Sequence, residues 1–178
     1  MSEKISQMFF VEKLKKANWY VREQVTDHTK NSRADVIAYH PKFDENIAFE
    51  LKVPKGLSDE TKALRQMIRY RNTYFDKMNV ALFCYMKPTI DTYHSGDNSI
   101  DMVCKRFFWR WGFGYGSLDS MVVEFVNGEN KNTLDLMNPL AATYNTDPKT
   151  KILKIREKSE KYWLNKDETD VLENKVLD

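Results

Sequence analysis

The sequence contains few of the residues that cross-link, bend or anchor a small protein. It has two cysteines, Cys84 and Cys104, with six glycines and five prolines among 178 residues. Two cysteines can form neither a disulfide framework nor a four-cysteine metal cluster. No apolar run approaches the length of a membrane span, and the first residues lack the apolar centre of a signal peptide. We therefore expect a cytoplasmic protein with no membrane partner.

Phosphate-binding glycine motifs are also missing. The glycine-rich stretch G-F-G-Y-G at 112–116 follows an expected helix and contains no G-K-[S/T]. This layout excludes a P-loop and a dinucleotide fingerprint, both of which need the glycines to open a helix. We predict a flexible structural turn there.

Neither sign of charge dominates the chain. The 28 basic and 26 acidic residues give a net charge of +2, and 42% of the residues are hydrophobic. Such a balance is compatible with nucleic acid, because a nuclease concentrates basic groups locally and surrounds its metal with acids. The length suits one domain with a full core, which we place at residues 1–146. Residues 147–178 are predicted to form a charged C-terminal helix and tail.

The hydrophobic pattern predicts an α/β fold. Residues 3–17 have helical spacing, followed by a strand at 19–25 and by two β-branched strands, at 36–39 and 47–53, joined by a polar turn. A helix carrying Leu64 and Ile68 then leads to the apolar strand at 80–86, which makes a parallel βαβ unit. Further along, we expect a helix at 100–111, a strand at 121–126 and irregular chain at 129–148.

In the first helix, Ile5, Met8 and Phe9 are expected to face the core. Continuing this face by three or four residues reaches Glu12, whose carboxylate would then point inward and need a partner. The alternative is that Glu12 lies at the edge of the apolar stripe and pairs with Lys15 or Lys16.

Three charged residues on the two central strands form the candidate site. Glu50 and Lys52 emerge on the same face of one strand because side chains alternate, and Asp35 begins the neighbouring strand. Two carboxylates at this spacing suit Mg²⁺ or Mn²⁺, and a nearby lysine can stabilise charge on a phosphate. Phosphodiester hydrolysis is the reaction that this trio favours. An exposed cross-strand charge pair is the alternative, since [D/E]-x-K is common in chains rich in charge.

Together these segments resemble the P-D-(D/E)-x-K nuclease superfamily. The matching residues are Ala34-Asp35 in place of Pro-Asp, the complete Glu50-Leu51-Lys52, and Gln66 followed four residues later by Tyr70. The last pair is similar to the Q-x-x-x-Y motif of the RecB-like branch. The resemblance covers about the first half of the chain and implies a restriction-endonuclease-like core: a central mixed sheet flanked by helices in the order αβββαβ.

The resemblance also implies a role for each matching residue. Asp35, Glu50 and the carbonyl of Leu51 would bind Mg²⁺ or Mn²⁺, and Lys52 would serve the attacking water. Gln66 and Tyr70 would complete the catalytic group on the DNA side. Glu12 takes the place of the glutamate that many members carry on their first helix near the metal. Some RecB-like nucleases hold an iron–sulfur cluster on four cysteines, which this chain cannot form alone.

Basic residues near the motifs are the candidates for holding DNA phosphates. Lys30 and Arg33 lie in or next to the loop before the Asp35 strand, and Arg65 and Arg69 share the helix of Gln66. The predicted function is a metal-dependent deoxyribonuclease of repair, recombination or phage DNA processing, acting as an exonuclease or an endonuclease.

Two alternatives stay open. One is a Holliday-junction resolvase, which the first helix and strand also resemble and which would imply a homodimer. The other is an inactive DNA-binding or protein-interaction module on the same fold.

Overall fold

The computed structural model describes residues 2–26, 33–41, 45–77, 80–89, 99–127 and 130–139. Its helices are α1 (Glu3–Lys16), α2 (Leu57–Lys77) and α3 (Ser99–Arg110). Its strands are β1 (Tyr20–Thr26), β2 (Arg33–His40), β3 (Glu45–Leu51), β4 (Val80–Lys87), β5 (Gly114–Ser117), β6 (Val122–Asn127) and β7 (Asn130–Asp135). Among these residues, no helix combines the length and the apolar character needed to cross a membrane.

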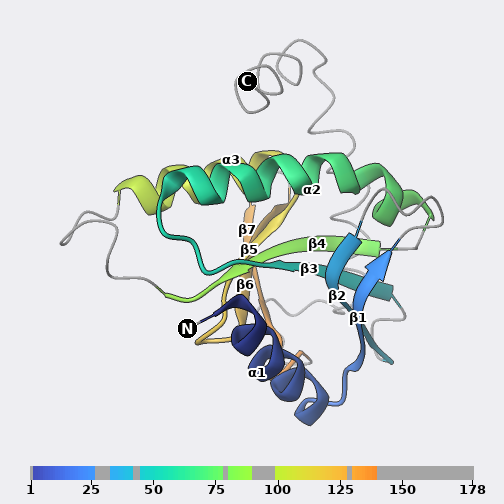
Figure 1. Cartoon of the computed structure of the whole chain (residues 1–178). Helices are drawn as coiled ribbons and strands as arrows, with labels where there is room; N and C mark the ends of the chain where they lie inside the picture. Colours follow the sequence, from blue (N-terminus) through green and yellow to red (C-terminus); the bar gives the residue numbers. More distant parts are fainter. Residues whose placement is uncertain are drawn as a thin grey trace.

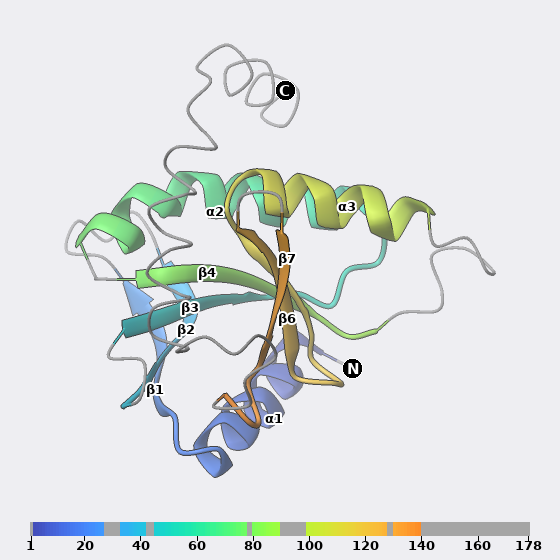
Figure 2. The ribbon, with the colours of Figure 1, turned by 180° about the vertical axis from the view of Figure 1, so that it is seen from behind.

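The described strands form one mixed sheet of seven strands in the order β1 to β7. β3, β4 and β5 run parallel at its centre, and the remaining neighbours are antiparallel. α2 and α3 cover one face of the sheet and α1 lies on the other (Figures 1 and 2). The predicted α/β class is confirmed, as is the order helix, three strands, helix, strand in the first half. The parallel βαβ unit formed by β3, α2 and β4 is also confirmed.

Each face of the sheet carries its own hydrophobic core. Phe10 of α1 packs edge-on against Phe49 of β3, with the ring centroids 5.0 Å apart. On the other face, Met67 of α2 and Phe108 of α3 cover Tyr85 of β4. β4 is buried along its whole length, as its unbroken apolar sequence predicts. Cys84 lies in this strand, and burial raises the pKa of its thiol well above the usual value, so it is an inert core residue.

The expected inward face of α1 is wrong. Ile5, Met8 and Phe9 are 45%, 62% and 52% exposed, whereas Phe10 and Leu14 are buried. α1 carries apolar residues on two sides, and the side that faces the sheet is the one that brings Phe10 onto Phe49. Local periodicity cannot choose between two apolar sides, because the choice depends on the surface that the helix meets.

Two further predictions for the second half of the chain are corrected. The glycine stretch expected to be a flexible turn contributes β5, a buried strand between β4 and β6. A Cβ atom on Gly114 would lie 2.6 Å from Val123 Cγ1 and 2.8 Å from Cys84 Sγ, so glycine is required for close packing. The stretch expected to be irregular after residue 129 begins with β7, an edge strand whose polar residues hide its pairing with β6.

Candidate active site

Asp35 lies directly against the Glu50-Leu51-Lys52 segment. Its Oδ2 accepts a hydrogen bond of 2.9 Å from the backbone N–H of Leu51. The antiparallel register of β2 and β3 pairs Val36 with Phe49, and continuing it by one residue places Asp35 opposite Glu50. The structure therefore brings together the segments that the motif had predicted to meet.

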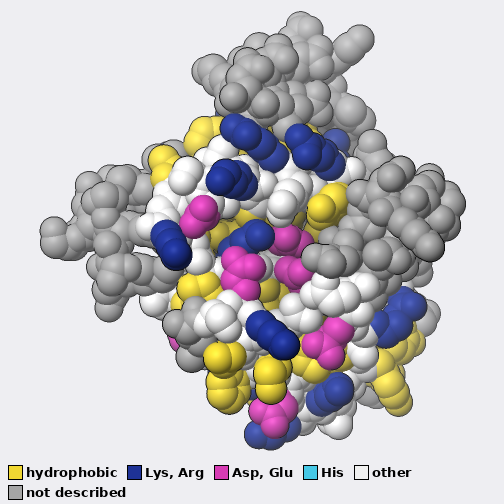
Figure 3. Space-filling model, viewed as in Figure 1, with side chains coloured by type: hydrophobic (Ala, Val, Ile, Leu, Met, Phe, Trp, Pro, Cys, Tyr) yellow, Lys and Arg dark blue, Asp and Glu magenta, His cyan; other side chains and the backbone are white. Residues whose placement is uncertain are grey.

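Glu50 and Lys52 form the second part of the cluster. Glu50 follows Ala48, which belongs to the core beneath α2, and so emerges on the same face of β3. The Glu50 side chain is 8% exposed, and its Oε1 lies 4.0 Å from Lys52 Nζ. Lys52 is 23% exposed, which makes it the more accessible member of the pair. In Figure 3, acidic side chains surround a basic one in the middle of the face below α2.

The oxygen atoms of this cluster suit a hard divalent cation. Asp35 uses two of its roughly four acceptor positions, for Leu51 and for the amide of Gln24. Within the described ranges, no group of three or more His, Cys, Asp or Glu residues is placed to hold a metal ion. The acidic oxygens that the cluster offers are those of two carboxylates, Asp35 and Glu50. Mg²⁺ is usually held by one or two carboxylates, with water and substrate phosphate completing its coordination.

α2 presents its basic residues on its outer side. Lys62 and Arg69 are exposed and Arg65 is half-buried. Figure 3 shows Lys and Arg side chains along α2, above the acidic cluster. Positive charge therefore borders the candidate site on the side where α2 covers the sheet.

Gln66 and Tyr70 both lie half-buried on α2. Tyr70 packs against the core beneath that helix. No hydrogen bond joins Gln66 to Asp35, Glu50 or Lys52 in the described part of the chain. Their expected catalytic roles stay predictions.

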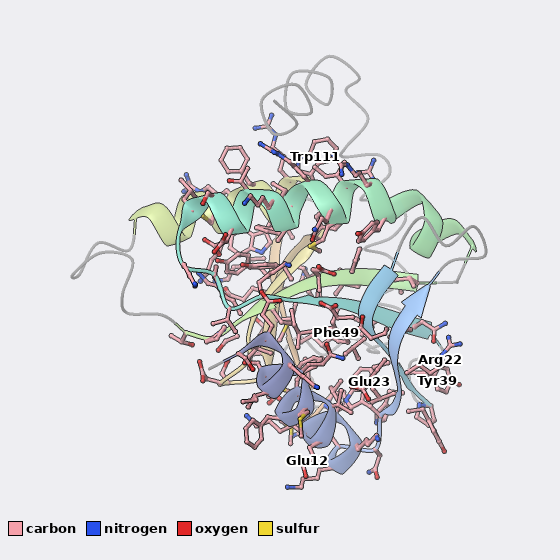
Figure 4. The ribbon with its side chains drawn as sticks, viewed as in Figure 1. Glu12, Arg22, Glu23, Tyr39, Phe49 and Trp111 are labelled. Atoms are coloured by element: carbon pink, nitrogen blue, oxygen red, sulfur yellow. The ribbon has the colours of Figure 1, made fainter. Side chains whose placement is uncertain are left out.

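Glu12 does not face the cluster. Its side chain is exposed, and Figure 4 shows it on the far side of α1 from Phe49. The α1 residue that connects to Asp35 is Gln7, through Gln24. Glu12 lies about 7.5 Å further along the helix axis and about 140° around it. Lys30 and the side chain of Arg33 lie outside the described residues.

A buried ion pair on the same face of the sheet was not predicted. Glu60 of α2 is 1% exposed, and its Oε1 lies 3.1 Å from Nζ of Lys87, the last residue of β4. The hydroxyls of Tyr115 and Tyr85 donate to the same oxygen at 2.7 Å and 3.3 Å. Lys87 Nζ also lies 5.2 Å from the ring centroid of Tyr115.

This pair is continuous with the candidate site. Tyr85 is the register partner of Glu50 across the parallel β3–β4 pair. Lys52 continues that pairing, because its N–H donates to the carbonyl of Met86 at 3.0 Å, so Lys87 is its neighbour on β4. Helical spacing could have indicated Glu60, since Ala63, Leu64 and Met67 lie on the same side of α2 and are buried.

Two glutamines were also missed by sequence reasoning. Gln24 Nε2 donates to Asp35 Oδ1 at 3.4 Å and to Gln7 Oε1 at 3.1 Å. Gln7 Nε2 in turn donates to Glu23 Oε1 at 3.1 Å. Nothing in the sequence indicated the partners of either glutamine.

Comparison of the chain with family models, with curated proteins and with solved structures finds no match.

Proposed function

We propose that the protein is a divalent-metal-dependent deoxyribonuclease that hydrolyses phosphodiester bonds on a restriction-endonuclease-like core. The single observation that carries the proposal is the hydrogen bond from Leu51 N–H to Asp35 Oδ2. It places the carboxylate of the first motif against the peptide between Glu50 and Lys52.

The roles follow from the chemistry of the side chains. Asp35, Glu50 and the Leu51 carbonyl would hold Mg²⁺ or Mn²⁺, which when bound polarises phosphoryl oxygens and promotes ionisation of a water. Lys52 orients the attacking water and stabilises negative charge on the phosphate oxygens. The water oxygen bonds to phosphorus, the ester P–O bond breaks, and a proton passes to the leaving oxygen.

Substrate binding would depend on the basic residues beside this cluster. Lys62, Arg65 and Arg69 follow one another along α2 at spacings of three and four residues, which keeps them on neighbouring positions of the helix surface. Such a row can track the phosphates of a DNA strand without selecting a base. Binding is therefore expected to weaken steeply as the salt concentration rises.

Cleavage of labelled linear, circular and branched DNA in Mg²⁺ or Mn²⁺ tests the proposal. We expect Lys52→Ala to lower the cleavage rate by roughly 10²- to 10³-fold, because one group that stabilises the transition state is worth about that much. DNA binding, measured by fluorescence anisotropy, should change little. Circular substrate separates endonuclease from exonuclease activity, and branched substrate tests the resolvase alternative.

Lys55→Ala is the matched control. Lys55 is exposed and lies three residues beyond Lys52 on the same connection to α2. Lys55→Ala removes one positive charge, as Lys52→Ala does, but it should leave the cleavage rate unchanged. Equal activities of wild type and Lys52→Ala, or no metal-dependent cleavage of any DNA, would contradict the proposal. In the second case, DNA binding without Mg²⁺ would favour the inactive module.

A further inference from the structure

Gln24 has a strained backbone in the middle of an edge strand. Its φ of 51° lies in the left-handed region, which a residue with a Cβ atom adopts at a cost. The pairing of β1 with β2 is regular on both sides, with Glu23 opposite Val36 and Val25 opposite Ala34. The register therefore places Gln24 directly opposite Asp35. Within β1, the strain is therefore confined to the residue that lies opposite Asp35.

Helix termination or core packing explains the other left-handed residues that are not glycine among those described, but neither explains Gln24. Asn18 has φ 68° directly after the end of α1, where left-handed asparagine commonly ends a helix. Met121 has φ 57° in the turn between β5 and β6, and its side chain is 1% exposed in the core. Gln24 is exposed, so no core contact holds it in place.

What holds Gln24 is a chain of side-chain amides. Its Nε2 bridges Asp35 Oδ1 and Gln7 Oε1, and Gln7 Nε2 reaches Glu23 Oε1. Figure 4 shows Glu23 on β1 beside α1. The chain thus links α1, on one side of the sheet, to the carboxylate of Asp35 near the start of β2. Strained residues that persist at exposed positions cluster at functional sites.

We propose that Gln24 is a positioning residue for Asp35: its strained backbone directs the amide that fixes one carboxylate oxygen, while Leu51 N–H fixes the other. With both oxygens held, Asp35 keeps one orientation toward Glu50. The expected effect of Gln24 on metal binding rests on the proposed function. The orientation of Asp35 can be measured whether or not the protein binds a metal.

Gln24→Ala and Gln24→Gly form the decisive pair. Both remove the amide, but only glycine relieves the left-handed backbone. In an ordinary strand, glycine is less stable than alanine. Here we expect the opposite order, with the Tm of Gln24→Gly about 2–4 °C above that of Gln24→Ala, because glycine adopts the left-handed conformation without the steric cost that alanine meets.

Metal binding should depend on the Gln24 side-chain amide and not on the stability of the variant. We expect both variants to bind Mn²⁺ roughly 10-fold more weakly by calorimetry, at the lower end of what loss of a group supporting a metal ligand causes. The Asp35 side chain should lose its single rotamer in NMR coupling constants. Gln7→Ala, which removes only the outer amide, should weaken Mn²⁺ binding less than either.

The outcomes separate this inference from the proposed function. Unchanged Mn²⁺ affinity in both variants, beside a wild type that binds Mn²⁺, overturns the role of Gln24. A Tm that is lower for Gln24→Gly than for Gln24→Ala contradicts the claim that the Gln24 backbone is strained. If the wild type binds no Mn²⁺ and cuts no DNA, the proposed function fails. The rotamer of Asp35 then decides the inference alone. If the Asp35 side chain loses its single rotamer in the variants, the inference is supported. If the side chain keeps that rotamer, the inference is overturned.

Discussion

Two Lys–Glu pairs lie side by side on the face of the sheet beneath α2, and their surroundings differ. In the first, Lys52 Nζ is 4.0 Å from Glu50 Oε1, and the lysine is 23% exposed. In the second, Lys87 Nζ is 3.1 Å from Glu60 Oε1, and the two side chains are 7% and 1% exposed. The residues are of the same types and both glutamates are buried, but the lysine of the first pair (the open pair) reaches solvent and the lysine of the second (the closed pair) does not.

The difference follows from what covers each pair. Glu60 receives two tyrosine hydroxyls besides the ammonium of Lys87, so one of its oxygens is fully engaged inside the protein. The Glu50–Lys52 contact is too long for a hydrogen bond, and Lys52 follows the end of β3. The closed pair fixes the docking of α2 on β4, whereas in the other pair the Lys52 ammonium can reach solvent. The contrast teaches that the exposure of the lysine and the contacts of the carboxylate, and not residue type, separate a structural pair from a candidate catalytic one.

The largest expected effect comes from breaking the closed pair. Glu60→Gln keeps the shape of the side chain but leaves the Lys87 ammonium buried without its counter-charge. Removing one partner of a buried ion pair costs roughly 3–5 kcal/mol, so we expect a loss of this size in the free energy of unfolding. Urea denaturation followed by circular dichroism measures it.

Glu50→Gln is the matched change in the open pair. We expect it to cost about 1 kcal/mol or less, because the Glu50–Lys52 contact is long and Lys52, unlike Lys87, can turn to water when the carboxylate becomes a neutral amide. It should nevertheless abolish the metal-dependent cleavage that we propose. Equal losses of stability in the two variants would show that the distinction between closed and open pairs is mistaken.

A smaller effect is expected when both members of the closed pair are replaced. In Glu60→Leu with Lys87→Met, neither charge is left buried alone, and apolar side chains of similar size fill the space. Such replacements are often neutral, so the double variant should recover most of the stability lost by Glu60→Leu alone. The comparison uses the same urea denaturation. A double variant as unstable as the single one would indicate that the tyrosine hydroxyls, left without an acceptor, dominate the cost.

The same comparison shows what could be predicted from the sequence. Glu50 and Lys52 were identified because their spacing on a strand and the later Gln66 form a local pattern. Glu60 belongs to no such pattern: it lies in the first turn of α2, where an acidic residue is favoured near the positive end of any helix. Its partner Lys87 lies 27 residues later, at the end of an apolar strand. Their pairing depends on how α2 docks over β4, which no local pattern contains.

The order of elements was predictable for a related reason. Strands and helices in the first half have clear periodicities, so the predicted order of the elements was correct even where the predicted buried side of a helix was wrong. The side of α1 that packs was wrong because Phe9 and Phe10 are equally apolar, and only contact with Phe49 selects Phe10. The left-handed backbone of Gln24 is a property of the assembled sheet.

The smallest expected effect concerns a third carboxylate, in a more exposed pairing, and it depends on pH. Glu124 Oε2 lies 2.6 Å from Lys131 Nζ, and its Oε1 lies 3.3 Å from Lys105 Nζ. Burial alone would raise the pKa of Glu124, but the hydrogen bond from Lys131 and the charges of both lysines outweigh it and lower the pKa. The folded protein therefore releases this proton at a lower pH than the unfolded chain does.

The sign of the effect on stability follows from proton binding. Between the two pKa values the unfolded chain binds more protons, so the contribution of Glu124 is complete above its unfolded pKa of about 4.3 and disappears as pH falls through the lowered folded value. Because the side chain is 24% exposed, we expect Glu124→Gln to cost only about 0.5–1 kcal/mol at pH 7. Its unfolding free energy should converge on that of the wild type between roughly pH 5 and 3. A gap that stays constant across this range would mean that packing, and not charge, gives Glu124 its contribution to stability.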